Sequence, residues 1–77
     1  MIEFSSEVER RLYIQVNGEL REAKERSSLA ELISELKLKS EQIAIELNRE
    51  VVRRANWETT TLSEGDKVEI VHFVGGG

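Results

Sequence analysis

Residues 12–36 read LYIQVNGELREAKERSSLAELISEL and contain the signals of a β-hairpin followed by a helix. The apolar side chains at positions 12, 14 and 16 alternate with more polar ones, which is the period of a strand with one buried face. Asn17-Gly18 follows at once, and both residue types tolerate the positive φ angles of a type I′ turn. The chain therefore doubles back into a second strand over residues 19–24. The apolar residues of this strand alternate poorly, and we predict that it lies at an edge of the sheet.

A helix is predicted to begin at Ser28. Ser28 and Glu31 form a Ser-x-x-Glu capping box, in which the hydroxyl and the carboxylate each satisfy a free backbone N–H of the first turn. Four branched side chains then recur at the spacing of one helix face, namely Leu29, Leu32, Ile33 and Leu36. This stripe predicts a short helix that docks on a sheet through an apolar face.

The second half of the chain contains further strand signals. Residues 43–47 alternate, and Asn48-Arg49 offers a turn into a short strand at Glu50-Val51-Val52. Residues 55–58 are predicted to form an irregular or single-turn helical connection, in which Trp57 is a partly buried structural anchor. After a turn at residues 63–66, a last strand is expected over residues 67–74. Its end is apolar at successive positions, which predicts a central strand covered on both sides or one whose end contacts a partner.

The order strand, strand, helix, strand, strand, strand predicts an α+β fold with one mixed sheet of four to five strands and one main helix across one face. If the first and last strands are neighbours at its centre, the fold is a β-grasp. We assign residues 12–74 to this domain. Residues 1–11 form an N-terminal extension, which is either a flexible arm or an added strand, and residues 75–77 form a flexible glycine tail.

Composition excludes several classes of function. The 77 residues include no cysteine and a single histidine, so disulfides, a thiolate nucleophile and a histidine-cluster metal site are not expected. The net charge of −4, with both signs mixed, does not favour nucleic-acid binding. No apolar run is long enough to span a membrane, and no signal peptide is recognisable. We therefore expect a cytoplasmic, monomeric protein that binds neither nucleic acid nor membrane.

The chain ends on an apolar run followed by Gly75-Gly76-Gly77. Glycine has no Cβ and adopts positive φ freely, so such a tail can pass through a slot that excludes side chains. A partner enzyme could then reach the terminal carboxylate. The alternative is a functionless end, because chain termini are often poorly ordered.

Residues 12–77 resemble the ThiS family of sulfur carriers of thiamine biosynthesis. The resemblance is carried by Val16–Glu19, the helix from Ser28, residues 43–48, 51–57 and 62–70, and the ending His72–Gly77. Two features depart from the family pattern. Residues 1–11 are additional here, and Arg53 occupies a position where many members have proline.

The resemblance implies a ubiquitin-like β-grasp protein that catalyses nothing itself and binds no cofactor. An E1-like adenylyltransferase of the ThiF type would use ATP and Mg²⁺ to adenylate the carboxylate of Gly77. Sulfur from a cysteine desulfurase would then form a thiocarboxylate, which a ThiG-type thiazole synthase would consume. Gly77 is thus the predicted site of covalent sulfur attachment, Gly75 and Gly76 provide access, and Phe73 and Val74 are predicted to contact partners.

Other functions are compatible with the same residues. A MoaD-like carrier that supplies molybdopterin synthesis, or a carrier for cysteine or another sulfur metabolite, would share the fold and the glycine end. A noncovalent ubiquitin-like binding module would use its exposed sheet surface instead. A small enzyme is not expected, because the sequence has no triad, metal cluster or phosphate-binding loop, and we assign no chemistry to His72.

Overall fold

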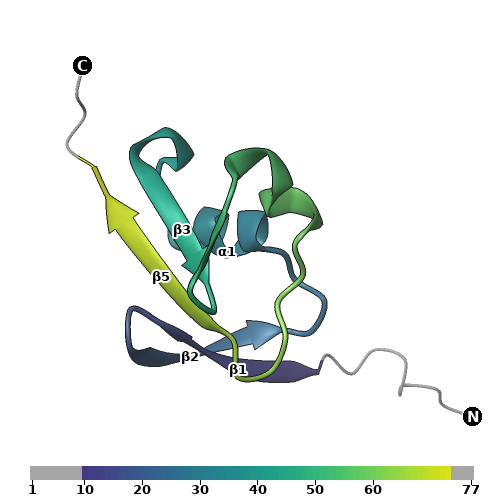
Figure 1. Ribbon diagram of the computed structural model, residues 1–77. Coiled ribbons are helices and arrows are strands. Elements are labelled where there is room, and N and C mark those ends of the chain that lie inside the picture. Colours follow the sequence, from purple (N-terminus) through teal and green to yellow (C-terminus); the bar gives the residue numbers. More distant parts are fainter. Residues whose placement is uncertain (1–9, 74–77) are drawn as a thin grey trace, which may run out of the picture.

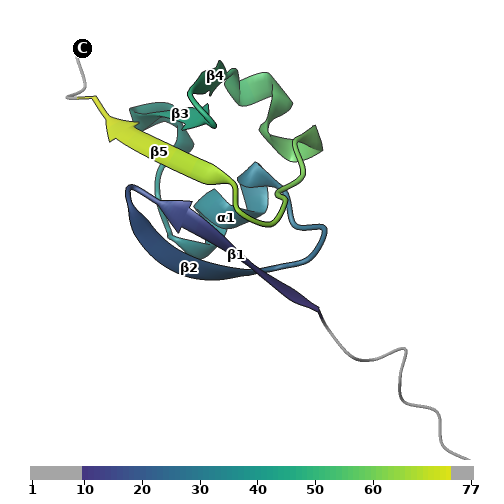
Figure 2. The same ribbon diagram turned by 60° about the horizontal axis from the view of Figure 1, so that its bottom comes forward.

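The computed structural model describes residues 10–73, and Figures 1 and 2 show how its helices and strands are arranged. The elements in chain order are β1 (Arg11–Val16), β2 (Glu19–Lys24), α1 (Leu29–Glu35), the 3-10 helix η2 (Ser40–Gln42), β3 (Ile43–Leu47), β4 (Glu50–Val52), the 3-10 helix η3 (Arg54–Thr59) and β5 (Lys67–His72). Among these residues, none of the helices has the length and apolar character needed to cross a membrane.

The strands form one sheet in the order β2-β1-β5-β3-β4. β1 and β5 are parallel neighbours at its centre, with Gln15 opposite Lys67 and Val16 opposite Val68, whereas the other three pairs of strands are antiparallel. The predicted α+β fold is therefore confirmed, and the central parallel pair is the β-grasp arrangement. β2 lies at an edge of the sheet, as its weak alternation predicted.

One face of the sheet is covered by α1, as Figure 2 shows. Leu29, Leu32 and Ile33 are buried, and they belong to the same core as Ile14 and Val68 of the two central strands. The capping box is present, because the Glu31 N–H donates to Ser28 Oγ at 3.1 Å and the Ser28 N–H donates to the Glu31 carboxylate at 2.9 Å. The predicted start and buried face of the helix are confirmed.

Both hairpins turn through residues with positive φ. Asn17 and Gly18 have φ angles of 51° and 84° between β1 and β2, and Asn48 and Arg49 have φ angles of 52° and 74° between β3 and β4. Positive φ at both central positions is the geometry of the two-residue turns that match the twist of a hairpin. The two predicted turns are therefore confirmed.

Several boundaries differ from the predicted ones. β5 ends at His72 rather than at residue 74, and β1 begins at Arg11, one residue early. The connection at residues 55–58 is part of the six-residue helix η3, which lies beside α1. Trp57 is a structural anchor as predicted, but it is more deeply buried, and its indole N–H donates to the carbonyl of Val52 at 2.8 Å. Residues 1–9 of the predicted extension lie outside the described residues.

Candidate functional site: the exit of strand β5

The C-terminal end of β5 is the part of the described structure closest in sequence to the glycine tail. Its ladder with β3 pairs Ile43 with His72, and one further bond follows, in which the Phe73 N–H donates to the carbonyl of Gln42 at 3.0 Å. The backbone therefore stays attached to the sheet as far as Phe73. Four predicted site residues, Val74 and Gly75 to Gly77, lie outside the described residues.

Two asparagines, one from each hairpin turn, hold β5 in place. The Asn17 side chain replaces a strand residue where β1 has ended, because its Oδ1 accepts from the Ile70 N–H at 2.6 Å and its Nδ2 donates to the Ile70 carbonyl at 3.3 Å. On the other side of β5, Asn48 Oδ1 accepts from the Lys67 N–H at 2.9 Å, and Asn48 Nδ2 donates to Asp66 at 3.0 Å. The strand that leads to the tail is thus fixed on both edges by side-chain amides. Sequence reasoning had recognised these asparagines only as turn residues.

Within residues 10–73, no helix covers the face of the sheet opposite α1, and we call it the open face. The exposed large apolar side chains of residues 10–73 lie on this face. The alternation along the strands and their register place on it Tyr13, Leu20, Val51 and Val71, which are 44%, 72%, 70% and 55% exposed. Phe73 follows Val71 with the same alternation and is 50% exposed.

These exposures decide between the two interpretations of the apolar end of β5. The strand is central in the sheet, but the expectation that both of its sides are covered is wrong, because helix α1 covers only one face. The other interpretation, contact with a partner, stays a prediction. Exposed apolar side chains at the end of a strand, such as Val71 and Phe73, can form part of a site where proteins bind one another.

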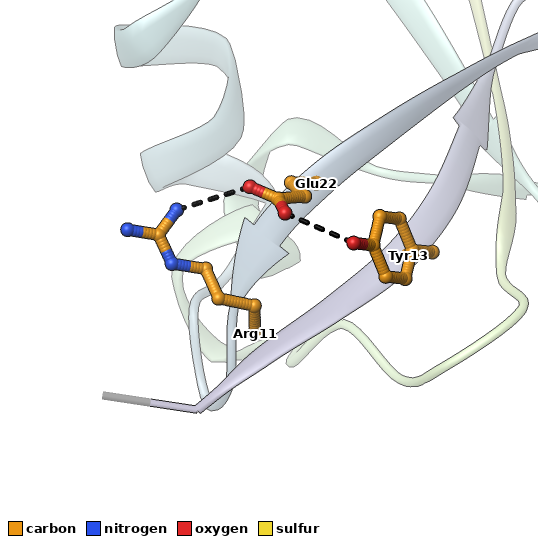
Figure 3. Close-up of polar contacts among 3 residues, drawn as sticks. All are labelled: Arg11, Tyr13 and Glu22. Atoms are coloured by element: carbon orange, nitrogen blue, oxygen red, sulfur yellow. Dashed lines mark hydrogen bonds and ion pairs between the residues drawn. The ribbon is translucent and has the colours of Figure 1, made fainter. Parts of the chain in front are cut away.

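A polar network occupies the β1–β2 part of the open face (Figure 3). The Tyr13 hydroxyl donates to Glu22 Oε2 at 3.0 Å, and Arg11 Nη1 lies 3.3 Å from Glu22 Oε1. These residues face one another across the antiparallel ladder, in which Tyr13 is opposite Glu22. The Tyr13 N–H also donates to the carboxylate of Glu64 at 3.1 Å, which ties β1 to the loop before β5.

The hydrogen bond to Glu22, followed by the negative charge of that carboxylate, raises the pKa of Tyr13 above its ordinary value. Ionisation is therefore harder in the folded protein, and the stabilisation is complete below the ordinary pKa of tyrosine and is lost as the pH rises through the folded-state pKa. Because Tyr13 is the only tyrosine, its absorbance on alkaline titration reports this pKa alone. We expect Glu22→Ala to lower the pKa, and Glu22→Gln, which keeps an acceptor but not the charge, to lower it less.

The control for this titration is Glu19→Gln, which removes a carboxylate from the same strand without touching Tyr13. It should leave the titration curve in place. A pKa that does not move in Glu22→Ala would contradict the network drawn in Figure 3.

The described residues bring together little that resembles a catalytic centre. Within residues 10–73, no group of three or more histidine, cysteine, aspartate or glutamate side chains could hold a metal ion. His72 is exposed at the end of β5, opposite Ile43, and among these residues its side chain makes no hydrogen bond.

Comparison with known proteins places the chain in a family. The model of the ThiS family matches residues 14–77. The sulfur carrier protein ThiS of Bacillus subtilis is 31% identical over 65 residues, which cover 83% of this chain and 98% of that protein. The crystal structure of the thiamine biosynthesis protein ThiS from Geobacter metallireducens superposes with a TM-score of 0.75 at 38% identity and covers 86% of this chain and all of that one.

Longer proteins contain a similar segment. A thiazole synthase of Magnetococcus marinus is 39% identical over 64 residues, which are 83% of this chain. The chain spans only 20% of the length of that protein. In contrast, the two ThiS proteins are matched over 98% and 100% of their own lengths, and the family model covers residues 14–77 of this chain. The resemblance found in the sequence is therefore confirmed, and the chain belongs to the ThiS family.

Proposed function

We propose that the chain is a sulfur carrier of thiamine biosynthesis, whose C-terminal Gly77 carries the sulfur as a thiocarboxylate. The observation that supports this most is the match of the ThiS family model through residue 77, so that the glycine end is part of the family pattern. The fold is consistent with it, because β5 lies at the centre of the sheet and its backbone stays paired as far as Phe73, four residues before the end of the sequence. In this role the chain is a substrate of other enzymes rather than an enzyme.

The chemistry begins with an unreactive group. An α-carboxyl group has a pKa of about 3.3–3.7, so at neutral pH Gly77 carries a carboxylate that resists attack by sulfur nucleophiles. A ThiF-type adenylyltransferase with ATP and Mg²⁺ would let a carboxylate oxygen attack the α-phosphorus, with loss of pyrophosphate. A persulfide derived from a cysteine desulfurase would then attack the acyl-adenylate and displace AMP, which gives an acyl disulfide. A thiol reductant would cleave the S–S bond of this acyl disulfide and leave the thiocarboxylate.

The tail and the end of β5 supply access. Four residues follow Phe73, and at about 3.3–3.6 Å per residue the terminal carboxylate lies at most about 13–14 Å from this point. An enzyme that acts on Gly77 must therefore approach Phe73 and Val74 closely, and their apolar side chains suit a protein contact. Gly75 and Gly76 would let the tail enter a narrow cleft.

The proposed acceptor of the sulfur is a thiazole synthase. Proteins of this name from Magnetococcus marinus and Paramagnetospirillum magneticum contain segments that are 39% and 37% identical to the chain. A carrier-like segment within a synthase chain supports a functional association between the two. This observation favours thiamine biosynthesis over delivery to molybdopterin or to cysteine.

The acceptor can be tested with the thiocarboxylate form of the protein, which can be made chemically by intein cleavage with sulfide. We expect a thiazole synthase to incorporate its sulfur into a thiazole and to regenerate the Gly77 carboxylate. A molybdopterin synthase large subunit should not take up the sulfur. Transfer to molybdopterin and not to thiazole would overturn the proposed pathway but leave the carrier chemistry intact.

A further inference from the structure

Two like charges lie directly opposite each other on the open face. In the antiparallel register of β3 and β5, Glu46 is the partner of Glu69. Cross-strand partners have Cβ atoms about 4.5–5.5 Å apart, and like charges at such positions weaken a sheet. Among residues 10–73, neither carboxylate forms a hydrogen bond or an ion pair, and Lys67, on the same face two residues before Glu69, does not pair with it. The pair therefore does not stabilise the domain by itself.

The position of this pair relates it to the tail. The same row of the sheet continues from Glu46 to the exposed Val51 of β4. The next row toward the chain end pairs Ala44 with Val71, and Phe73 follows. We call Val51, Glu46, Glu69, Val71 and Phe73 the docking strip. An enzyme that reaches a carboxylate within about 13–14 Å of Phe73 covers the end of this strip and lies next to the two glutamates.

We propose that Glu46 and Glu69 together receive an arginine or lysine side chain of the adenylating enzyme, a proposal that rests on the function proposed above. An enzyme that collects ATP and a carboxylate in one site needs positive potential around it, and such potential attracts an acidic partner surface. A cation between the two carboxylates would relieve their repulsion, and its aliphatic stem would pack on the flanking valines. The docking strip would thus bind a positively charged side chain of the enzyme, while the tail brings the Gly77 carboxylate into the active site.

The test uses neutral isosteres in the full-length protein. Glu46→Gln and Glu69→Gln remove the repulsion, so the free protein should become more stable, with a melting temperature higher by about 1–5 °C. The same variants should raise the KM for the protein about 3- to 10-fold in ATP–pyrophosphate exchange catalysed by the ThiF-type enzyme of the same organism, with kcat unchanged. The penalty should shrink as salt is added, because salt screens the lost attraction.

The matched control is Glu58→Gln, which makes the same change in net charge on η3, an element that packs beside α1. Its KM should equal that of the wild type. If Glu46→Gln and Glu69→Gln leave the KM unchanged, or raise it only as much as the control does, this proposal is overturned. The carrier function still stands in that case, provided that the wild-type protein supports exchange. Absence of exchange with the wild-type protein would overturn the carrier function and this proposal with it.

Discussion

Removal of Gly77 is expected to abolish sulfur loading completely. The deletion shortens the tail by about 3.3–3.6 Å, which withdraws the carboxylate from an active site that is built for a fixed reach. Gly77→Val should fail as well, because its branched side chain would clash in a slot suited to glycine. Both variants should give no ATP–pyrophosphate exchange and no mass increase when incubated with the ThiF-type enzyme, ATP and a sulfur source. Their melting temperatures should match the wild type.

A semisynthetic protein with a C-terminal amide on Gly77 is the sharpest control. It keeps every tail residue and the full reach, but it lacks the carboxylate oxygen that attacks ATP. We expect it to bind the adenylating enzyme and to inhibit loading of the wild type without being loaded itself. Exchange activity with the amide, or sulfur gained by the protein without Gly77, would show that the terminus is not the site of attachment.

Asn17→Ala is expected to be the most damaging of the substitutions proposed for the folded domain. It removes both hydrogen bonds to the partly buried backbone of Ile70 and places alanine at a φ of 51°. The Ile70 N–H, which makes the shorter of the two bonds, costs about 1–3 kcal/mol when it is left unpaired, and the left-handed conformation adds about 1 kcal/mol. We therefore expect a loss of at least about 2–4 kcal/mol in the free energy of unfolding. Denaturant unfolding followed by the fluorescence of Trp57, the only tryptophan, measures this loss.

Two further variants separate the contributions of the turn and of the side chain. Asn17→Gly accepts the positive φ without strain but still leaves Ile70 unpaired, so it should be destabilised somewhat less than Asn17→Ala. Asn56→Ala changes an exposed asparagine on η3 and should have little effect. A fully stable Asn17→Gly protein would mean that the side chain serves the turn alone and does not hold β5.

The parts of the fold that depend on neighbouring residues in the chain could be predicted from the sequence. The Asn17-Gly18 turn, the capping box at Ser28 and the alternation of Leu12, Ile14 and Val16 each depend on residues that are close in the chain. Their combination left few ways to bury the helix stripe, and the β-grasp sheet is the arrangement found. The end of β5 was predicted too long, because apolar residues favour a strand whether or not a neighbouring strand is present to pair with them.

Features that depend on contacts between distant residues could not be predicted. Asn17 and Ile70 are separated by 53 positions, and nothing in either local sequence indicates that a side-chain amide completes the ladder. The opposition of Glu46 and Glu69 likewise requires the register between β3 and β5. The tail was recognised from composition and family resemblance, whereas the open face beside it became visible only with the order of the strands.

Tandem mass spectrometry of the loaded protein tests the central claim most directly. After incubation with the ThiF-type enzyme, ATP, a cysteine desulfurase with cysteine and a thiol reductant, the intact protein should gain the mass that corresponds to exchange of one oxygen atom for sulfur. Fragmentation should place this change on Gly77, and alkylation should label the terminal thiocarboxylate. Sulfur located on any other residue, or an unmodified terminus after demonstrated turnover of ATP, would contradict the account.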